Sequence, residues 1–185
     1  MDEKSKQLIS DTRQPIRMSE GKVKKIDYEY KRNGTRNIFV AVEPKAGKHF
    51  LKVTRTRTKA DFAIFIKELV YGIYSQVEMI IVVLDNLNTH FVKSFYETFS
   101  KQEADELLKR VKFYYTPKHA SWLNMAEIEI SMLEEECIGR RIGAESLLIE
   151  ETSEWVKQVN QEKRKINWQY TKRDAYKKLS KHYVS

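Results

Sequence analysis

The stretch IIVVLDNLN, residues 80–88, decides the fold of this chain. Its five leading apolar residues have no helical spacing and stop abruptly at polar residues, which predicts a central strand buried on both faces. Asp85 follows directly. In open α/β sheets, ligands and chemistry gather beyond the carboxyl ends of the strands, so Asp85 is a candidate for chemistry in a crevice. The alternative is an Asx turn that closes a core strand, and this stretch alone does not separate the two.

An antiparallel meander is predicted ahead of that strand. Residues 21–32 and 37–42 form the two arms of a hairpin that turns at Asn33-Gly34, the strongest short hairpin signal in the chain. Residues 47–56 alternate between apolar and polar side chains, as a half-buried strand does.

Helices and one further strand are predicted around and after residues 80–88. Apolar residues recur at helical spacing over residues 58–74, with a carboxylate in the first turn, and less regularly over 92–108. Residues 111–115 indicate a short strand, and 145–161 another helix. The predicted order is three antiparallel strands, helix, strand, helix, strand, helix.

The helix predicted between Asn124 and Gly139 carries several carboxylates. Asn124 can cap it with Glu127 three positions later, as in a capping box. At 100° per residue, Glu127 lies on one flank of the apolar stripe and Glu129 on the other. Helix geometry does not choose between them, and a capping role is the alternative for Glu127.

Composition narrows the class of protein. The 185 residues, 41% hydrophobic and 32% charged, suit one globular domain, and +7 of the net charge of +8 lies after residue 156. Cys137 is the only cysteine, which excludes disulfide frameworks and cysteine-rich metal sites within one chain. No apolar run reaches the ~20 residues of a membrane span, and the N-terminus lacks a signal peptide, so we expect no membrane partner and a cytoplasmic location.

Three sequence blocks resemble a known family. The predicted order of elements is similar to the ribonuclease-H-like fold. LDNLNTH (84–90) and YTPKHASWLNMAEIE (115–129) resemble the second and third signature blocks of DDE transposases of bacterial insertion sequences, in the Tc/mariner-like superfamily. MDEK (1–4) resembles the first block, and GTRNIFVAVEPKAG (34–47) extends the likeness.

The resemblance implies an α/β, ribonuclease-H-like mixed sheet, with an antiparallel meander plus parallel strands flanked by helices. It assigns catalysis and metal binding to Asp2, Asp85 and Glu127, which would hold two Mg²⁺ or Mn²⁺ ions. Such hard ions prefer oxygen ligands and promote in-line phosphoryl transfer. The implied reaction is cleavage of DNA and transfer of the freed strand, on transposon ends and target DNA, by a homodimer. The signature blocks also contain three accessory candidates, namely Asn86, His90 and His119.

Basic residues in two regions are candidates for DNA contacts, and a solvated charged surface is the alternative for each region. The candidates are Lys52, Arg55, Arg57, Lys59, Lys163, Arg164, Lys165, Lys172 and Arg173.

We predict a catalytic domain over residues 1–142 and, over 143–185, a C-terminal helix and basic tail that pack on it. Family members carry an N-terminal helix-turn-helix domain and a strand that delivers the first aspartate, whereas only Met1 precedes Asp2 here. We therefore expect a split, frameshifted or degraded reading frame, with an upstream-encoded fragment as a partner. The alternatives to a transposase catalytic domain are a noncatalytic DNA-binding remnant and a structure-selective nuclease of the same fold.

Overall fold

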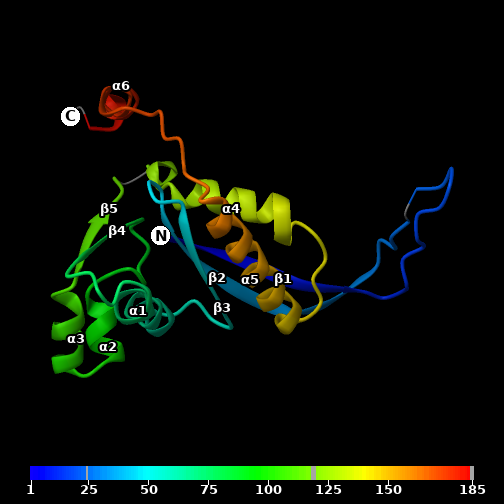
Figure 1. Ribbon diagram of the computed structural model, residues 1–185, viewed down its shortest axis with the longest axis horizontal. Coiled ribbons are helices and arrows are strands. Elements are labelled where there is room, and N and C mark those ends of the chain that lie inside the picture. The colour runs from blue at the N-terminus through cyan, green and yellow to red at the C-terminus, as the bar shows by residue number, and fades with distance from the viewer. Residues whose placement is uncertain (24, 118–119, 184–185) are drawn as a thin grey trace.

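The computed structural model describes residues 1–23, 25–117 and 120–183 (Figure 1). An antiparallel sheet contains β1 (Asp2–Asp11), β2 (Tyr30–Glu43) and β3 (Lys48–Thr54), with β2 in the middle. A parallel pair contains β4 (Ile80–Leu84) and β5 (Val111–Tyr115). With helices flanking both sheets, the predicted mixed α/β, ribonuclease-H-like fold class is confirmed.

The helices follow the predicted segments closely. They are α1 (Lys59–Glu68) with its π-helical continuation η1 (Leu69–Ile73), α2 (Lys93–Thr98), α3 (Lys101–Leu108), the 3-10 turn η2 (Ser121–Leu123), α4 (Ala126–Leu133) with the π-helical η3 (Glu134–Ile138), α5 (Glu145–Glu162) and α6 (Lys172–Tyr183). None of the helices in the described residues is long and apolar enough to cross a membrane.

The prediction of a hairpin turn at Asn33-Gly34 is wrong. β2 runs straight through this dipeptide, and the hairpin instead joins β1 to β2 through a longer connection, whose residues 12–23 and 25–29 project from the body of the molecule (Figure 1). The β1–β2 register shifts between Gln7 and Ile9, and Gly34 has a φ of 95°. Asn-Gly therefore supplies a β-bulge, which needs the same left-handed backbone as a tight turn.

The prediction that residues 80–84 are buried on both faces is also wrong. Val82 and Leu84 are buried, whereas Ile81 is 65% and Val83 45% exposed. Among the described strands, β4 pairs with β5 alone, so one edge of β4 carries no neighbouring strand. An apolar run predicts a strand, but whether both faces of that strand are buried depends on the neighbouring strands and helices.

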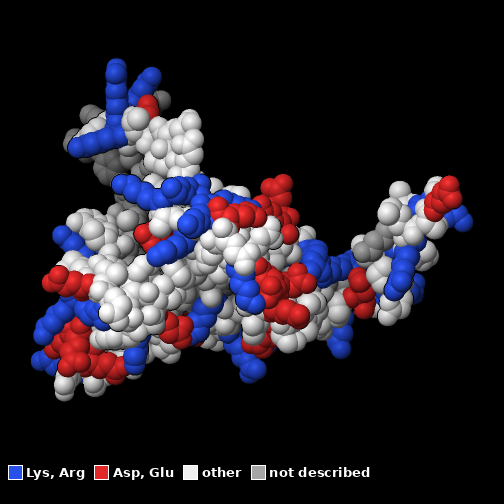
Figure 2. Space-filling view, viewed as in Figure 1, with Lys and Arg blue, Asp and Glu red and all other residues white. Residues whose placement is uncertain are grey.

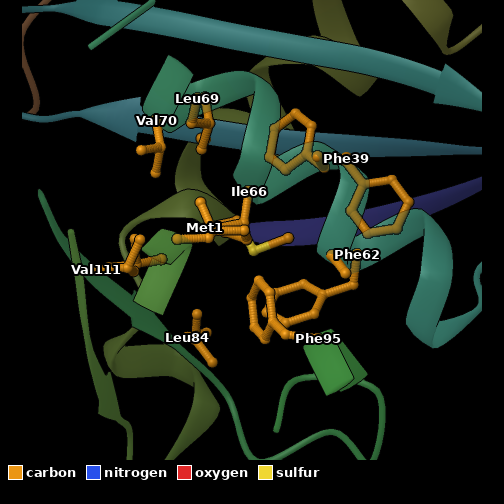
Figure 3. Packing of buried hydrophobic residues seen from close by; sticks show 14 of the residues in the cluster. Met1, Phe39, Phe62, Ile66, Leu69, Val70, Leu84, Phe95 and Val111 are labelled. Carbon is orange, nitrogen blue, oxygen red and sulfur yellow. The ribbon is translucent and has the colours of Figure 1, made fainter. Parts of the chain in front are cut away.

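Two apolar clusters hold the elements together. The first lies between the two sheets and contains Met1, Phe39, Phe62, Leu84 and Phe95, which Figure 3 shows packed around the start of the chain. The second joins the antiparallel sheet to α4 and α5. Met1 thus packs within the first cluster, directly before the first predicted site residue.

Candidate active site

Asp2 lies at the beginning of β1, opposite Val40 of β2. Its Oδ1 accepts a hydrogen bond of 2.8 Å from the backbone N–H of Glu3. On the other side, the buried Asn124 donates from Nδ2 to the backbone oxygen of Met1 (2.8 Å) and to Asp2 Oδ2 (3.2 Å). Asn124 therefore ties the first aspartate to the segment that leads into α4.

The capping box predicted at Asn124 and Glu127 is not formed. Helix α4 begins at Ala126, and Asn124 Oδ1 accepts from the N–H of Ala126 instead of that of Glu127. The amide of Asn124 is occupied by Met1 and Asp2, which fixes its orientation. Asn124 binds residues more than 120 positions away in the sequence, and a local capping pattern does not predict such contacts.

Asp85 lies directly after β4, half-buried, and its Oδ1 accepts from the N–H of Leu87 over 3.2 Å. The amino group of Met1 donates to the backbone oxygen of Val83 over 2.8 Å, which brings the start of β1 beside the end of β4 (Figure 1). Burial raises the pKa of Asp2 to about 6, and the negative charges of Asp85 and Glu3 add to the effect. The two aspartates therefore interact electrostatically.

His90 connects Asp85 to β1. Its Nδ1 lies 2.7 Å from Asp85 Oδ1 and its Nε2 lies 2.6 Å from Glu3 Oε1. Burial opposes a positive charge on the ring, but the carboxylates of Glu3 and Asp85 outweigh burial and raise the pKa of His90. Protonated, the ring donates to both carboxylates.

His90 is completely buried, so it does not face substrate. Its ring packs 4.9 Å from that of Phe62, and Tyr115 donates from its hydroxyl to the His90 backbone oxygen. The geometry assigns it to holding Asp85 in place. Sequence reasoning missed its partner Glu3, since a contact over 87 positions leaves no local pattern.

The two carboxylates that helix geometry left open have different surroundings. Glu129 is 1% exposed, and His49 Nε2 lies 2.7 Å from its Oε2. Glu127 is half-buried in the first turn of α4. Because Glu129 is enclosed with a partner, Glu127 is the one of the two that can still take a ligand.

Asn86 donates from Nδ2 to the backbone oxygen of Thr116 and so ties the loop after β4 to the end of β5. His119, the third accessory candidate, lies outside the described residues.

The carboxylate oxygens of the candidate site are of the kind that a hard divalent ion prefers, but they are not gathered around one point. Asp2 and Asp85 offer carboxylate oxygens, and the pKa of Asp2 is raised first by burial and further by the negative charges of Asp85 and Glu3, which a bound cation would offset. Across the described residues, however, no three His, Cys, Asp or Glu side chains lie where they could hold an ion together. The chemistry of the donors fits Mg²⁺ or Mn²⁺, and the charge of Asp85 acts on the carboxyl group of Asp2.

The candidate basic residues divide by whether they have acidic partners. Lys52 pairs with Glu68, Arg55 with Glu145 at 3.4 Å, Lys59 with Glu97 at 2.8 Å, and Arg164 with Glu136 at 2.8 Å. Exposed side chains make up the rest: Arg57, Lys163, Lys165, Lys172 and Arg173. Figure 2 shows lysines and arginines gathered on the C-terminal segment, which favours that region for contacts with phosphate.

Comparison with known families gives a single clear result. Residues 1–149 match the model of a family described as DDE superfamily endonuclease. The chain belongs to this family. The match includes all three carboxylates that the resemblance assigned, and an endonuclease of the DDE superfamily acts on DNA. Searches of curated proteins and of solved structures found no match.

Proposed function

We propose that this DDE superfamily endonuclease is the catalytic domain of an insertion-sequence transposase of the Tc/mariner-like superfamily. It would cleave DNA strands at transposon ends and transfer them to target DNA, in the cytoplasm and as a homodimer. The observation that carries the proposal is the convergence of Asp2 and Asp85 at adjoining strand ends, where the Met1 amine bonds to Val83. Asn124 supports it by linking Asp2 to the segment that begins α4.

The proposal gives each residue a role. Asp2, Asp85 and Glu127 would hold two divalent ions, which when bound supply an activated attacking oxygen and stabilise the leaving oxygen of a phosphodiester. His90 orients Asp85 through Nδ1, and Glu3 fixes the far side of the imidazole. Asn86 holds the loop that carries Asp85 against the end of β5.

Residues 1–142 would form the catalytic domain and residues 143–185 the helix and tail that pack on it. The basic side chains of the tail, from Lys163 onward, would contact the DNA backbone. Such contacts position DNA without reading its sequence, so recognition of element ends would require a further domain or an upstream-encoded fragment.

The test is a nicking assay on labelled duplex DNA carrying the ends of the element, with Mg²⁺ or Mn²⁺. Asp2→Asn, Asp85→Asn and Glu127→Gln should each lower cleavage at least 100-fold, because each removes a charged oxygen ligand. Glu150→Gln, on the exposed side of α5, is the matched control and should cleave normally. Cleavage that survives Asp85→Asn would place the active site elsewhere.

A noncatalytic DNA-binding protein is the second candidate. It is favoured by the absence, in the part of the chain that the structure describes, of three carboxylates or other ligands gathered for a metal. If this second candidate is correct, DNA binding should be sensitive to salt and weakened by Lys172→Ala and Arg173→Ala. No cleavage should occur with either Mg²⁺ or Mn²⁺. A structure-selective nuclease would instead cut branched DNA without joining strands, and the same assay distinguishes all three.

A further inference from the structure

A carboxylate lies on the buried face of α4. Ala126 and Leu133 on this face are 1% and 0% exposed, and Glu129, which follows Ala126 by three positions, is 1% exposed. Residues at this spacing share one face of a helix, and the face packs against the antiparallel sheet. An ionised carboxylate in such apolar surroundings is costly unless another group compensates it.

The compensating group is the side chain of His49 on β3. His49 is 0% exposed, and its Nε2 lies 2.7 Å from Glu129 Oε2. Replacement of a buried pair of this kind by apolar side chains of similar volume is often neutral or stabilising, so stability alone does not explain the pair. A buried polar contact can instead specify one arrangement of the two elements that it joins, because other arrangements leave a polar group without its partner.

Helix α5, which lies beside β3, holds His49 from two sides (Figure 1). β3 is an edge strand, and the side chain of Asn160 pairs with it as a neighbouring strand would. Asn160 Oδ1 accepts from the backbone N–H of His49 over 2.7 Å, and its Nδ2 donates to the His49 backbone oxygen over 3.0 Å. Trp155 packs edge-on against the imidazole, with the ring centroids 5.9 Å apart. Because its backbone and its ring are both held, His49 is a fixed partner for Glu129.

The contact with His49 sets the rotation of α4 about its own axis. Glu127 precedes Glu129 by two positions, so the two side chains leave the helix about 200° apart. The start of the helix is attached to Asp2 through Asn124. With the start held there and Glu129 held by His49, the direction of Glu127 is fixed.

We propose that His49 and Glu129 are positioning residues, which hold α4 at the rotation that presents Glu127 to Asp2 and Asp85. Both side chains are buried, so neither contacts DNA or an ion. Helix α5 supports the site through its contacts with His49, although most of α5 lies beyond the residues 1–149 that match the family model. The consequence for a bound ion rests on the proposed function, whereas the rotation of α4 does not.

The main test replaces the pair with apolar side chains, as His49→Phe combined with Glu129→Met. Phenylalanine keeps a ring beside Trp155, and methionine keeps the length of glutamate. We expect the melting temperature to stay the same or rise. The affinity of the full chain for Mn²⁺, measured by titration calorimetry, should fall roughly tenfold, as when the support of a metal ligand is removed. A merely structural role would lower the affinity only together with the stability.

Glu129→Gln separates loss of the contact from loss of the charge. It removes the negative charge but keeps the side-chain length and an oxygen that accepts from His49, so the Mn²⁺ affinity should stay within about twofold of wild type. Thr152→Val is the matched control. Thr152 is a buried polar residue of α5 whose hydroxyl donates within its own helix, to the backbone oxygen of Leu148 over 2.7 Å. Its replacement should leave the Mn²⁺ affinity unchanged.

Paired nitroxide labels measure the rotation of α4 directly, without DNA or metal. The labels are attached to Ile128→Cys and Lys101→Cys in a Cys137→Ser background, and double electron–electron resonance gives the distances between them. Ile128 is 39% exposed next to Glu127, and Lys101 is exposed at the start of α3. We expect one narrow distance distribution when the pair is intact and a broadened or shifted one in the apolar double variant.

Asn160→Ala is a second, milder variant, in case the double variant does not fold. It removes both hydrogen bonds to the His49 backbone and leaves the pair itself in place. Because Asn160 is only half-buried, water can reach the freed backbone groups, and the chain should stay folded. We expect a broader distance distribution and a lower Mn²⁺ affinity, both changes being smaller than in the double variant.

A distance distribution that is the same in the apolar variant and in the wild type would overturn the proposal. So would a changed distribution with unchanged Mn²⁺ affinity, because Glu127 would then not depend on the rotation of α4. If the wild-type chain neither binds Mn²⁺ nor cleaves DNA, the proposed function fails. The label distances alone then decide whether the pair sets the rotation of α4.

Discussion

At the scale of single residues, the proposed site depends on a histidine that does not touch substrate. His90→Ala should lower metal-dependent cleavage by roughly 10- to 100-fold, the usual cost of removing a residue that orients a metal ligand. DNA affinity should change less than twofold, because the ring is buried. His90→Asn keeps one donor near Asp85 and should recover part of the rate.

The measurement is single-turnover cleavage against Mn²⁺ concentration, which separates metal affinity from the maximal rate. A positioning role requires His90→Ala to raise the Mn²⁺ concentration needed for half-maximal cleavage. An unchanged metal dependence with a lower melting temperature would make His90 structural only.

The start of α1 offers a residue-scale prediction for stability. Thr58 and Asp61 form a reciprocal capping box, and Asp61 Oδ2 accepts further from the Thr56 hydroxyl over 2.6 Å. Burial opposes ionisation of Asp61, but hydrogen bonds from Thr56 and Thr58 outweigh it and lower its pKa. Asp61→Asn should therefore cost ~1 kcal/mol at pH 7.

Because the folded state lowers the pKa of Asp61, its contribution is complete above the unfolded pKa of ~4 and is lost as pH falls through the folded value. Urea unfolding at pH 7 and pH 3 should show the difference between wild type and Asp61→Asn shrinking at the lower pH. A difference that is equal at both values would contradict the role of the ionised carboxylate.

At the scale of elements, the bulge in β2 needs its glycine. Gly34 has a φ of 95°, so Gly34→Ala should lower the free energy of unfolding by ~1–2 kcal/mol through backbone strain, although the added Cβ would meet Arg36 Nη1 only at an ordinary contact distance of 3.5 Å. Gly72, in the helical segment after α1, has open space and no such φ. Gly72→Ala should be neutral or stabilising in the same urea titration. Equal effects of the two changes would rule out strain as the cause.

Local patterns predicted the elements well and their surroundings poorly. Residues 111–115 and 145–161 were placed nearly to the residue, because periodicity and turn signals act over a few positions. The prediction of a tight turn at Asn33-Gly34 was wrong, because a β-bulge and a tight turn need the same left-handed backbone conformation. The burial of residues 80–84 misled as well, since it depends on a neighbouring strand and not on β4 itself.

The residues of the candidate site were also predictable only in part from the sequence. The resemblance supplied Asp2, Asp85 and Glu127, and their catalytic role stays a prediction. The contacts of Glu3 with His90 and of His49 with Glu129 join residues 87 and 80 positions apart, so no local pattern indicated them. Tertiary structure is what separates the enclosed Glu129 from the available Glu127.

At the scale of the whole molecule, the proposed metal site lies where the two sheets meet. Asp2 follows Met1 at the end of the β1–β2 ladder, and Asp85 follows β4. The amino group of Met1 donates to the backbone oxygen of Val83 and so links the two sheets beside these aspartates. An ion held by both carboxylates would add a second link between the sheets, so Mn²⁺ should stabilise the folded chain.

We expect Mn²⁺ at about 100 times its dissociation constant to raise the free energy of unfolding by ~2.7 kcal/mol in urea titrations. Asp85→Asn should abolish this gain, because it removes a charged ligand from one of the two sheets, and Glu150→Gln should retain it. A gain that survives Asp85→Asn would place the Mn²⁺ ion away from the junction of the sheets.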